Sequence, residues 1–292
     1  MTNKYKCIAS ICLSACLALC GYPLTVIQGM QLEHSHLLFF AFAAASLLMV
    51  VLMARQADRW RKKTPELLIY GLTAGVSTVL LHYSFLLGRP VAVVATFSTA
   101  VVVALFLDRL GKGENLVAIE FSMILSLLML AISTLFILSE FLVGQWWPLL
   151  AILAGIGFYR LSLLGRAQDD IPVLSRVAAL FVVSTWLVGM VLIFSPHSTT
   201  FPEENATVYS ALYGLLILVP IMVSLVFILM NQNRQTLLLW LALLLSVNFI
   251  SMLFDLKMTV VQSLWLLALI MLAQGIQFIG WRALAGVEVD KK

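Results

Sequence analysis

The sequence predicts an all-α integral membrane protein with ten transmembrane helices in two related five-helix halves. Hydrophobic residues make up 62% of the 292 residues and charged residues only 11%, which is more apolar surface than a soluble chain of this length could bury. A spanning helix needs about 20 mostly apolar residues, and the chain contains ten such runs separated by short polar segments. These two observations define the fold class.

The ten apolar runs follow one another along the whole chain and leave no soluble segment of domain size. A third observation, the distribution of basic residues, fixes their expected direction through the membrane. The runs cover residues 7–28, 36–54, 67–87, 91–107, 116–139, 146–165, 173–195, 207–230, 236–254 and 259–281.

Lys and Arg residues are concentrated in alternate segments between these runs. Sixteen of the 18 lie on one side, and only Arg89 and Lys257 lie on the other. Basic residues beside a span stay in the cytoplasm, so we expect both termini there and a multi-pass protein of the cell membrane, most simply a bacterial inner membrane. The net charge of +4 reflects this topology. Because the basic residues are dispersed and have no base-stacking platform, we expect no nucleic-acid partner.

A weak internal repeat divides the chain. Residues 89–120 contain an apolar run that ends on Asp108, a short Gly-containing loop and the start of another run. Residues 234–262 repeat this pattern with Asp255 in place of Asp108. The repeat predicts one five-helix half at residues 1–140 and a second at 141–292.

Two of the expected helices carry polar residues at helical spacing. Hydroxyl groups in membrane helices also bond to backbone carbonyls of their own helix, and this alternative holds for each residue singly. Together the two stripes favour a shared polar interior. The stripe at 67–87 is Tyr70, Thr73, Ser77 and Ser84, with Gly71 and Gly75 on another side for close helix packing. The stripe of the run at 207–230 is Tyr209, Tyr213, Pro220 and Ser224, continued by Asn231 directly after it.

The runs at 91–107 and 236–254 add further polar residues. The first contributes Thr99, and the second contributes Trp240 and Asn248. An amide at the depth of Asn248 must find partners or water, because an unsatisfied polar group there costs several kcal/mol. We expect Asn248 to face the bundle interior, either as a substrate contact or as a structural hydrogen bond between helices.

Two ionisable residues lie within the spans. His82 and Glu120 are therefore candidates for proton coupling, because a charge inside a membrane helix needs a reason. The alternatives are a neutral, hydrogen-bonded structural histidine for His82, and a side chain that reaches the inner surface for Glu120.

The chain resembles the EamA-like family of the drug/metabolite transporter superfamily. The resemblance is carried by the ten-span plan, by LLGRPVAVVATFSTAVVVALFLDRLGKGE and its echo LMNQNRQTLLLWLALLLSVNFISMLFD, and by Gly144-Gln145-Trp146-Trp147 leading into LLAILAGIGFYR. The resemblance implies two inverted five-helix repeats, with Asp108 and Asp255 closing equivalent helices. It also implies a central path between the halves, because such folds place the substrate near the midplane where the repeats meet.

These features predict a secondary transporter, an exporter of a small polar or amphipathic metabolite that works by alternating access. We expect a monomer or homodimer without a cofactor. The preferred substrate contacts are Tyr213, Trp240 and Asn248, joined by Tyr70, Ser77, Thr99 and Ser224.

Two other functions fit an all-helical membrane protein. A flippase for a lipid-linked precursor could use the same fold if its cavity opened sideways to the bilayer. A membrane-embedded enzyme is disfavoured, because the four histidines are scattered, with only an isolated pair at His34 and His36, and no metal-ligand cluster, paired acids or nucleophile motif is present. The expectation is therefore a protein that is not an enzyme and binds no metal.

Overall fold

The structure is a computed structural model that describes residues 34–54, 64–88, 144–167, 171–194 and 204–231, together with Pro23 and nine residues between 93 and 107. All regular elements in these residues are helical. They are α3 (His34–Ala54), α4 (Thr64–Leu87), α7 (Trp147–Ala167), α8 (Val173–Phe194), α9 (Glu204–Tyr213), the π-helical turn η2 (Gly214–Leu218) and α10 (Val219–Asn231).

Five of the predicted transmembrane runs are confirmed as helices that are long and apolar enough to cross a membrane. They are His34–Met53, Pro65–Leu87, Trp147–Leu164, Val173–Phe194 and Asn205–Phe227. The predicted ends agree with these segments to within three residues. The other five runs, and with them the count of ten helices, lie largely outside the described residues.

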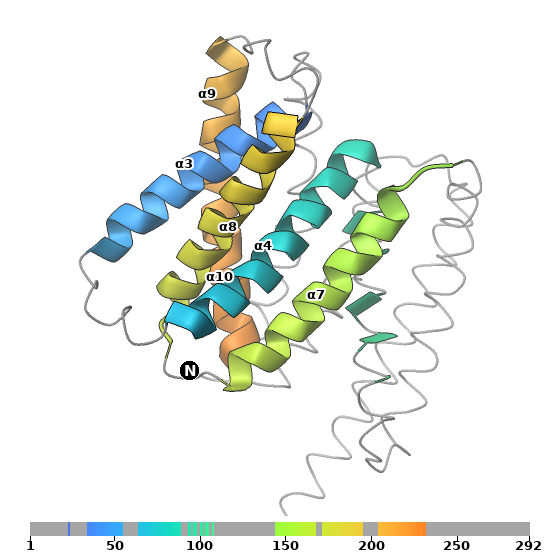
Figure 1. The fold of residues 1–292 in the computed structure, drawn as a ribbon, viewed down its shortest axis with the longest axis vertical. Helices are drawn as coiled ribbons and strands as arrows, with labels where there is room; N and C mark the ends of the chain where they lie inside the picture. Colours follow the sequence, from blue (N-terminus) through green and yellow to red (C-terminus); the bar gives the residue numbers. More distant parts are fainter. Residues whose placement is uncertain are drawn as a thin grey trace, which may run out of the picture.

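The described helices form one bundle in which α4 lies between α7 and α8, whereas α3 packs on α8, α9 and η2 (Figure 1). At one end of the bundle the Ser35 hydroxyl and the Tyr83 hydroxyl are 3.0 Å apart, which joins the start of α3 to the end of α4. At the opposite end the Ser175 hydroxyl lies 3.9 Å from the Met53 sulfur. We call these the Ser35 end and the Met53 end.

Small residues bring α4 and α8 into close contact, as the Gly71 and Gly75 pair predicted. A Cβ atom on Gly71 would lie 3.1 Å from Ala179 Cβ, and one on Gly75 would lie 2.8 Å from Val183 Cγ1. The contacting residues are four positions apart on both helices and follow the same order, so α4 and α8 run in the same direction. Such small-residue contacts let membrane helices approach closely and gain dispersion energy.

A second close contact joins η2 to α3. A Cβ atom on Gly214 would overlap the backbone carbonyl of Ala41. Figure 1 shows that α3 and α9 both begin at the Ser35 end, so these two helices run in the same direction, opposite to α4 and α8. Glycine is required at position 214 by this backbone contact.

The helix that crosses as Asn205–Phe227 contains the π-helical turn η2, closed by a hydrogen bond from the Val219 N–H to the Gly214 carbonyl. Pro220 follows directly and has no N–H to continue an α-helical ladder. A π-turn accommodates about one residue more than an α-helical turn, which changes the face that every later residue presents. Accordingly the buried positions shift from Ala206, Ser210 and Tyr213 before the turn to Leu218, Met222 and Leu225 after it.

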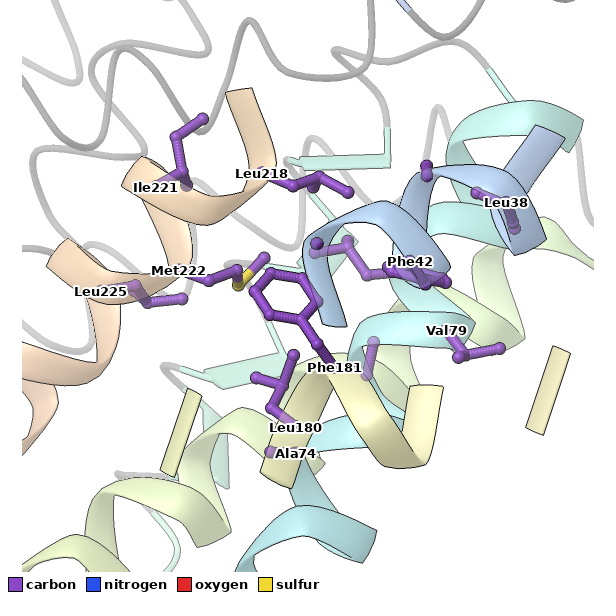
Figure 2. Close-up of a cluster of buried hydrophobic side chains, with 14 of the residues drawn as sticks. Leu38, Phe42, Ala74, Val79, Leu180, Phe181, Leu218, Ile221, Met222 and Leu225 are labelled. Atoms are coloured by element: carbon purple, nitrogen blue, oxygen red, sulfur yellow. The ribbon is translucent and has the colours of Figure 1, made fainter. Parts of the chain in front are cut away.

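The apolar core of the bundle lies between α3, α4, α8 and α10. Figure 2 shows the Phe181 side chain between Phe42 of α3 and Met222 of α10. The Phe42 and Phe181 ring centroids are 6.4 Å apart, and both side chains are fully buried. This core holds α10 against α8 on the Met53 side of the π-turn.

Candidate functional site

The most unusual polar group in the bundle is His82, in the last turns of α4. Its side chain is fully buried, and Nδ1 lies 2.7 Å from the backbone carbonyl of Thr78. Since a carbonyl oxygen only accepts hydrogen bonds, Nδ1 carries a proton and donates it. In the neutral ring Nε2 is then an acceptor, and it has no hydrogen-bond partner among the residues that the structure describes.

Thr78 adds a second unsatisfied atom one helical turn away. Its hydroxyl Oγ1 is fully buried and, within the described part of the chain, also has no hydrogen-bond partner. Positions four apart on a helix share a face, so Thr78 and His82 present these two atoms on the same side of α4. Buried polar atoms are normally satisfied, and each exception calls for a physical explanation.

Three aromatic rings surround the imidazole of His82. The ring centroids of Phe42, Phe85 and Tyr213 lie 5.3, 5.9 and 6.5 Å from that of His82, each at 71° to 81° to its plane. Phe42 comes from α3, Phe85 from α4 and Tyr213 from the junction of α9 and η2. Residues from both predicted halves of the chain therefore meet at this cluster, which we call the His82 cluster.

A second polar group lies nearer the Met53 end. Arg176 of α8 is fully buried; its guanidinium carbon lies 5.2 Å from the centre of the Tyr70 ring, and its Nε donates to the Ile171 carbonyl at 3.3 Å. A guanidinium over a tyrosine face is a cation–π contact, which gains strength where water is excluded. The predicted site residue Tyr70 thus faces an arginine and lies about 18 Å along α4 from His82.

The remaining hydroxyls of the α4 stripe bond to their own helix. Ser77 donates to the Thr73 carbonyl at 2.6 Å, and Ser84 donates to the Leu81 carbonyl at 2.6 Å. Ser77 also packs directly on Gly157 of α7. In this conformation both serines satisfy their hydrogen bonds within α4, which was the alternative interpretation of the stripe.

The second stripe is divided by the π-turn. Tyr213 is buried in the His82 cluster, whereas Tyr209, Pro220 and Ser224 are exposed. The spacing that joined Tyr213 to Ser224 assumed an uninterrupted α-helix, and the π-turn rotates the later residues away by about one position. Ser224 does not share a face with Tyr213 in this structure.

Four further predicted site residues lie outside the described part of the chain. They are Thr99, Glu120, Trp240 and Asn248.

Sequence reasoning missed three contributors to these clusters. Phe42 and Phe85 belong to apolar runs in which nothing distinguishes them from lipid-facing or core residues. Arg176 was counted among the residues of a cytoplasmic segment, although it lies three residues inside α8. Its place within an apolar run was the signal that could have marked it as buried.

The comparisons define a class of fold and no family. No protein-family model and no curated protein matches this sequence. A solved structure described only as "Crystal structure of protein" is similar over 96% of this chain and 97% of that chain, with 15% sequence identity and a TM-score of 0.65. At this identity the likeness establishes the fold alone, that of an all-helical protein whose described helices are long and apolar enough to cross a membrane.

Proposed function

We propose that this protein is a secondary transporter that exports a small polar or amphipathic metabolite by alternating access. The proposal includes ten transmembrane helices, two inverted repeats at 1–140 and 141–292 as in the EamA-like family, and cytoplasmic termini in an inner membrane. The observation that carries it is the meeting of His82 with Tyr213, buried side chains from the two halves whose ring centroids lie 6.5 Å apart. An ionisable residue inside a membrane bundle is costly, and inverted-repeat transporters bind their solutes where the halves meet.

Helix packing supports the inverted repeat. In the predicted numbering, α3 and α4 are the second and third helices, and α8 and α9–α10 are their counterparts, the seventh and eighth. Gly71 and Gly75 place the third helix on the seventh, and Gly214 places the eighth on the second. The two contacts correspond when the halves are exchanged. The helices run in the same direction within each pair and in opposite directions between pairs, as inversion requires.

The proposed solute path runs between the halves beside the His82 cluster. Tyr213 contributes hydrogen bonding and an aromatic surface, and Trp240 and Asn248 complete the site from the ninth helix. Tyr70 and Ser77 line the path further along α4. His82 and Glu120 are the groups proposed to couple transport to protons. Discrimination among solutes would come from hydrogen bonds and aromatic contacts.

The proposal is tested in two stages with purified protein. Melting is first measured with amino acids, nucleobases, vitamins, cationic drugs and short-chain polyprenyl phosphates, because a ligand at 100 times its Kd stabilises the folded state by about 2.7 kcal/mol. Radiolabelled hits are then followed in proteoliposomes preloaded with unlabelled solute. Transient accumulation of label supports a transporter. Stabilisation by lipid phosphates alone would favour a flippase.

A matched pair of variants connects transport to the site. Tyr213→Phe removes the hydroxyl of a buried tyrosine at the His82 cluster and should slow exchange at least tenfold. Tyr209→Phe makes the same change one turn earlier, at a side chain that is 49% exposed, and should leave exchange unchanged. Equal rates in both variants would remove the His82 cluster from the path.

A further inference from the structure

We infer that Thr78 and His82 form the subsite that receives the amino group of the transported solute, bound as an ammonium ion. This inference rests on the proposed transport function and adds the chemical class of the substrate.

The hydrogen bond that His82 already makes requires that a ligand group donate a hydrogen bond to it. Nδ1 already donates to the Thr78 carbonyl at 2.7 Å, so the neutral ring offers a lone pair at Nε2. Nε2 is fully enclosed and has no hydrogen-bond partner in the described helices. A carbonyl or carboxylate of a solute cannot satisfy this atom, because neither group has a proton to donate. An N–H or O–H group can.

The Thr78 hydroxyl makes the subsite bidentate. Oγ1 is the second unpartnered atom, and it lies one helical turn from His82 on the same face of α4. A primary ammonium has three N–H donors and can supply one to each atom. An alcohol could also reach both atoms, by donating to Nε2 and accepting from the Thr78 hydroxyl, so the preference for an ammonium comes from the charge-favouring surroundings of the subsite.

The surroundings favour a cation over a neutral donor. The rings of Phe42, Phe85 and Tyr213 enclose the imidazole, and aromatic rings attract a desolvated ammonium through their negative faces. Arg176, the buried cation of the described bundle, stacks on Tyr70 about 18 Å away along α4. The His82 cluster is thus separated from the positive charge that would repel an ammonium.

The subsite is sealed in this conformation, because Thr78 and His82 are both fully buried. Tyr213 covers it from the residue that immediately precedes the π-turn. Solute entry therefore requires that a helix packed around the His82 cluster move away from α4. A ligand that satisfies the two atoms would favour the state in which it can reach them.

The test uses three probes that share a phenyl ring and differ in the head group: phenethylammonium, 2-phenylethanol and phenylacetate. Full-length protein labelled with ¹⁵N-histidine is titrated with each probe, and the His82 Nε2 resonance is assigned by its loss in His82→Gln. We expect phenethylammonium to move this resonance toward the hydrogen-bonded range in a saturable manner. 2-Phenylethanol should require at least tenfold more ligand, and phenylacetate should have no effect.

Two variants provide an independent test of ammonium binding. Thr78→Val should weaken phenethylammonium binding about tenfold, whereas Thr185→Val, the same change at a hydroxyl bonded to the Phe181 carbonyl at 2.8 Å, should not. Equal responses to all three probes, no response of Nε2, or an Nε2 already hydrogen-bonded to buried water without ligand would each overturn the inference. Exchange of other solutes in proteoliposomes would then still uphold transport. Binding of phenethylammonium at Nε2 without exchange of any bound solute would uphold the subsite and refute transport.

Discussion

Replacing Thr78 by valine should make the ligand-free protein more stable. Valine has nearly the shape of threonine but carries a methyl group in place of the hydroxyl. Thr78 Oγ1 is fully buried and has no hydrogen-bond partner among the described residues. Leaving such a group unsatisfied costs about 1–3 kcal/mol, and an apolar group of the same shape does not incur that cost. The Thr78 backbone carbonyl, which accepts from His82 Nδ1, is unaffected by the change. We therefore expect a gain of about 1–3 kcal/mol in the free energy of unfolding.

The matched control is Thr185→Val on α8. The Thr185 hydroxyl donates to the Phe181 carbonyl at 2.8 Å, so its removal should cost about 0.5–1.5 kcal/mol. Both variants are measured by reversible denaturant unfolding of purified protein without ligand. The reasoning fails if Thr78→Val loses as much stability as Thr185→Val, because the Thr78 hydroxyl would then have a partner such as a buried water. Thr78→Val should therefore stabilise the ligand-free protein and also weaken amine binding. A substitution with these two opposite effects identifies Thr78 as a binding residue.

Three further substitutions test the packing and the path. Gly75→Ala should cost about 1–3 kcal/mol of stability because its Cβ would lie 2.8 Å from Val183 Cγ1. The control Gly189→Ala should cost less, because the nearest neighbour of its Cβ would be a ring atom at 3.3 Å. A reversed order of the two variants in thermal unfolding would contradict the close α4–α8 contact. Phe181→Ala should cost about 3–5 kcal/mol in the same assay, and a loss under 1 kcal/mol would show that this core can collapse around the vacancy. Asn248→Leu should abolish solute exchange in proteoliposomes at normal folded yield; unchanged exchange would exclude Asn248 from the site.

The helices could be predicted from sequence because their signals are local. Length and hydropathy located five spans to within three residues, since the bilayer imposes both properties on every crossing helix. The Gly71 and Gly75 pair was also predictable, because residues four apart on a helix share a face whatever surrounds them. Their partners, Ala179 and Val183, could be known only from the fold, which sets two distant segments side by side.

The site was less predictable because it depends on contacts between helices. His82 was identified only because it is an ionisable residue within a predicted membrane span. Its surroundings come from three segments, with Phe42 about 40 positions before it and Tyr213 about 130 after it, and no local pattern connects them. The sequence does not show that the Thr78 hydroxyl lacks a partner among the described residues, because Thr78 looks like any other threonine in a membrane helix. Ser224 was predicted to share a face with Tyr213 because the spacing of a regular α-helix was assumed across Gly214–Leu218. The π-turn changes that spacing.

The π-turn at Gly214–Leu218 also affects how this helix tolerates changes in length. On a regular α-helix, Tyr213 and Met222 would be about 180° apart; with one residue absorbed by the turn they are about 80° apart, so both face the bundle. The residues before and after the turn thus belong to two different phases of one helix. Deleting a single residue from the turn would convert it into a regular α-helical turn and leave Tyr213 and Met222 about 80° apart. Met222 and Leu225 would still face the bundle and Pro220 and Ser224 would stay outward, so this turn is the place where the helix can lose a residue without exchanging the surfaces of its later half.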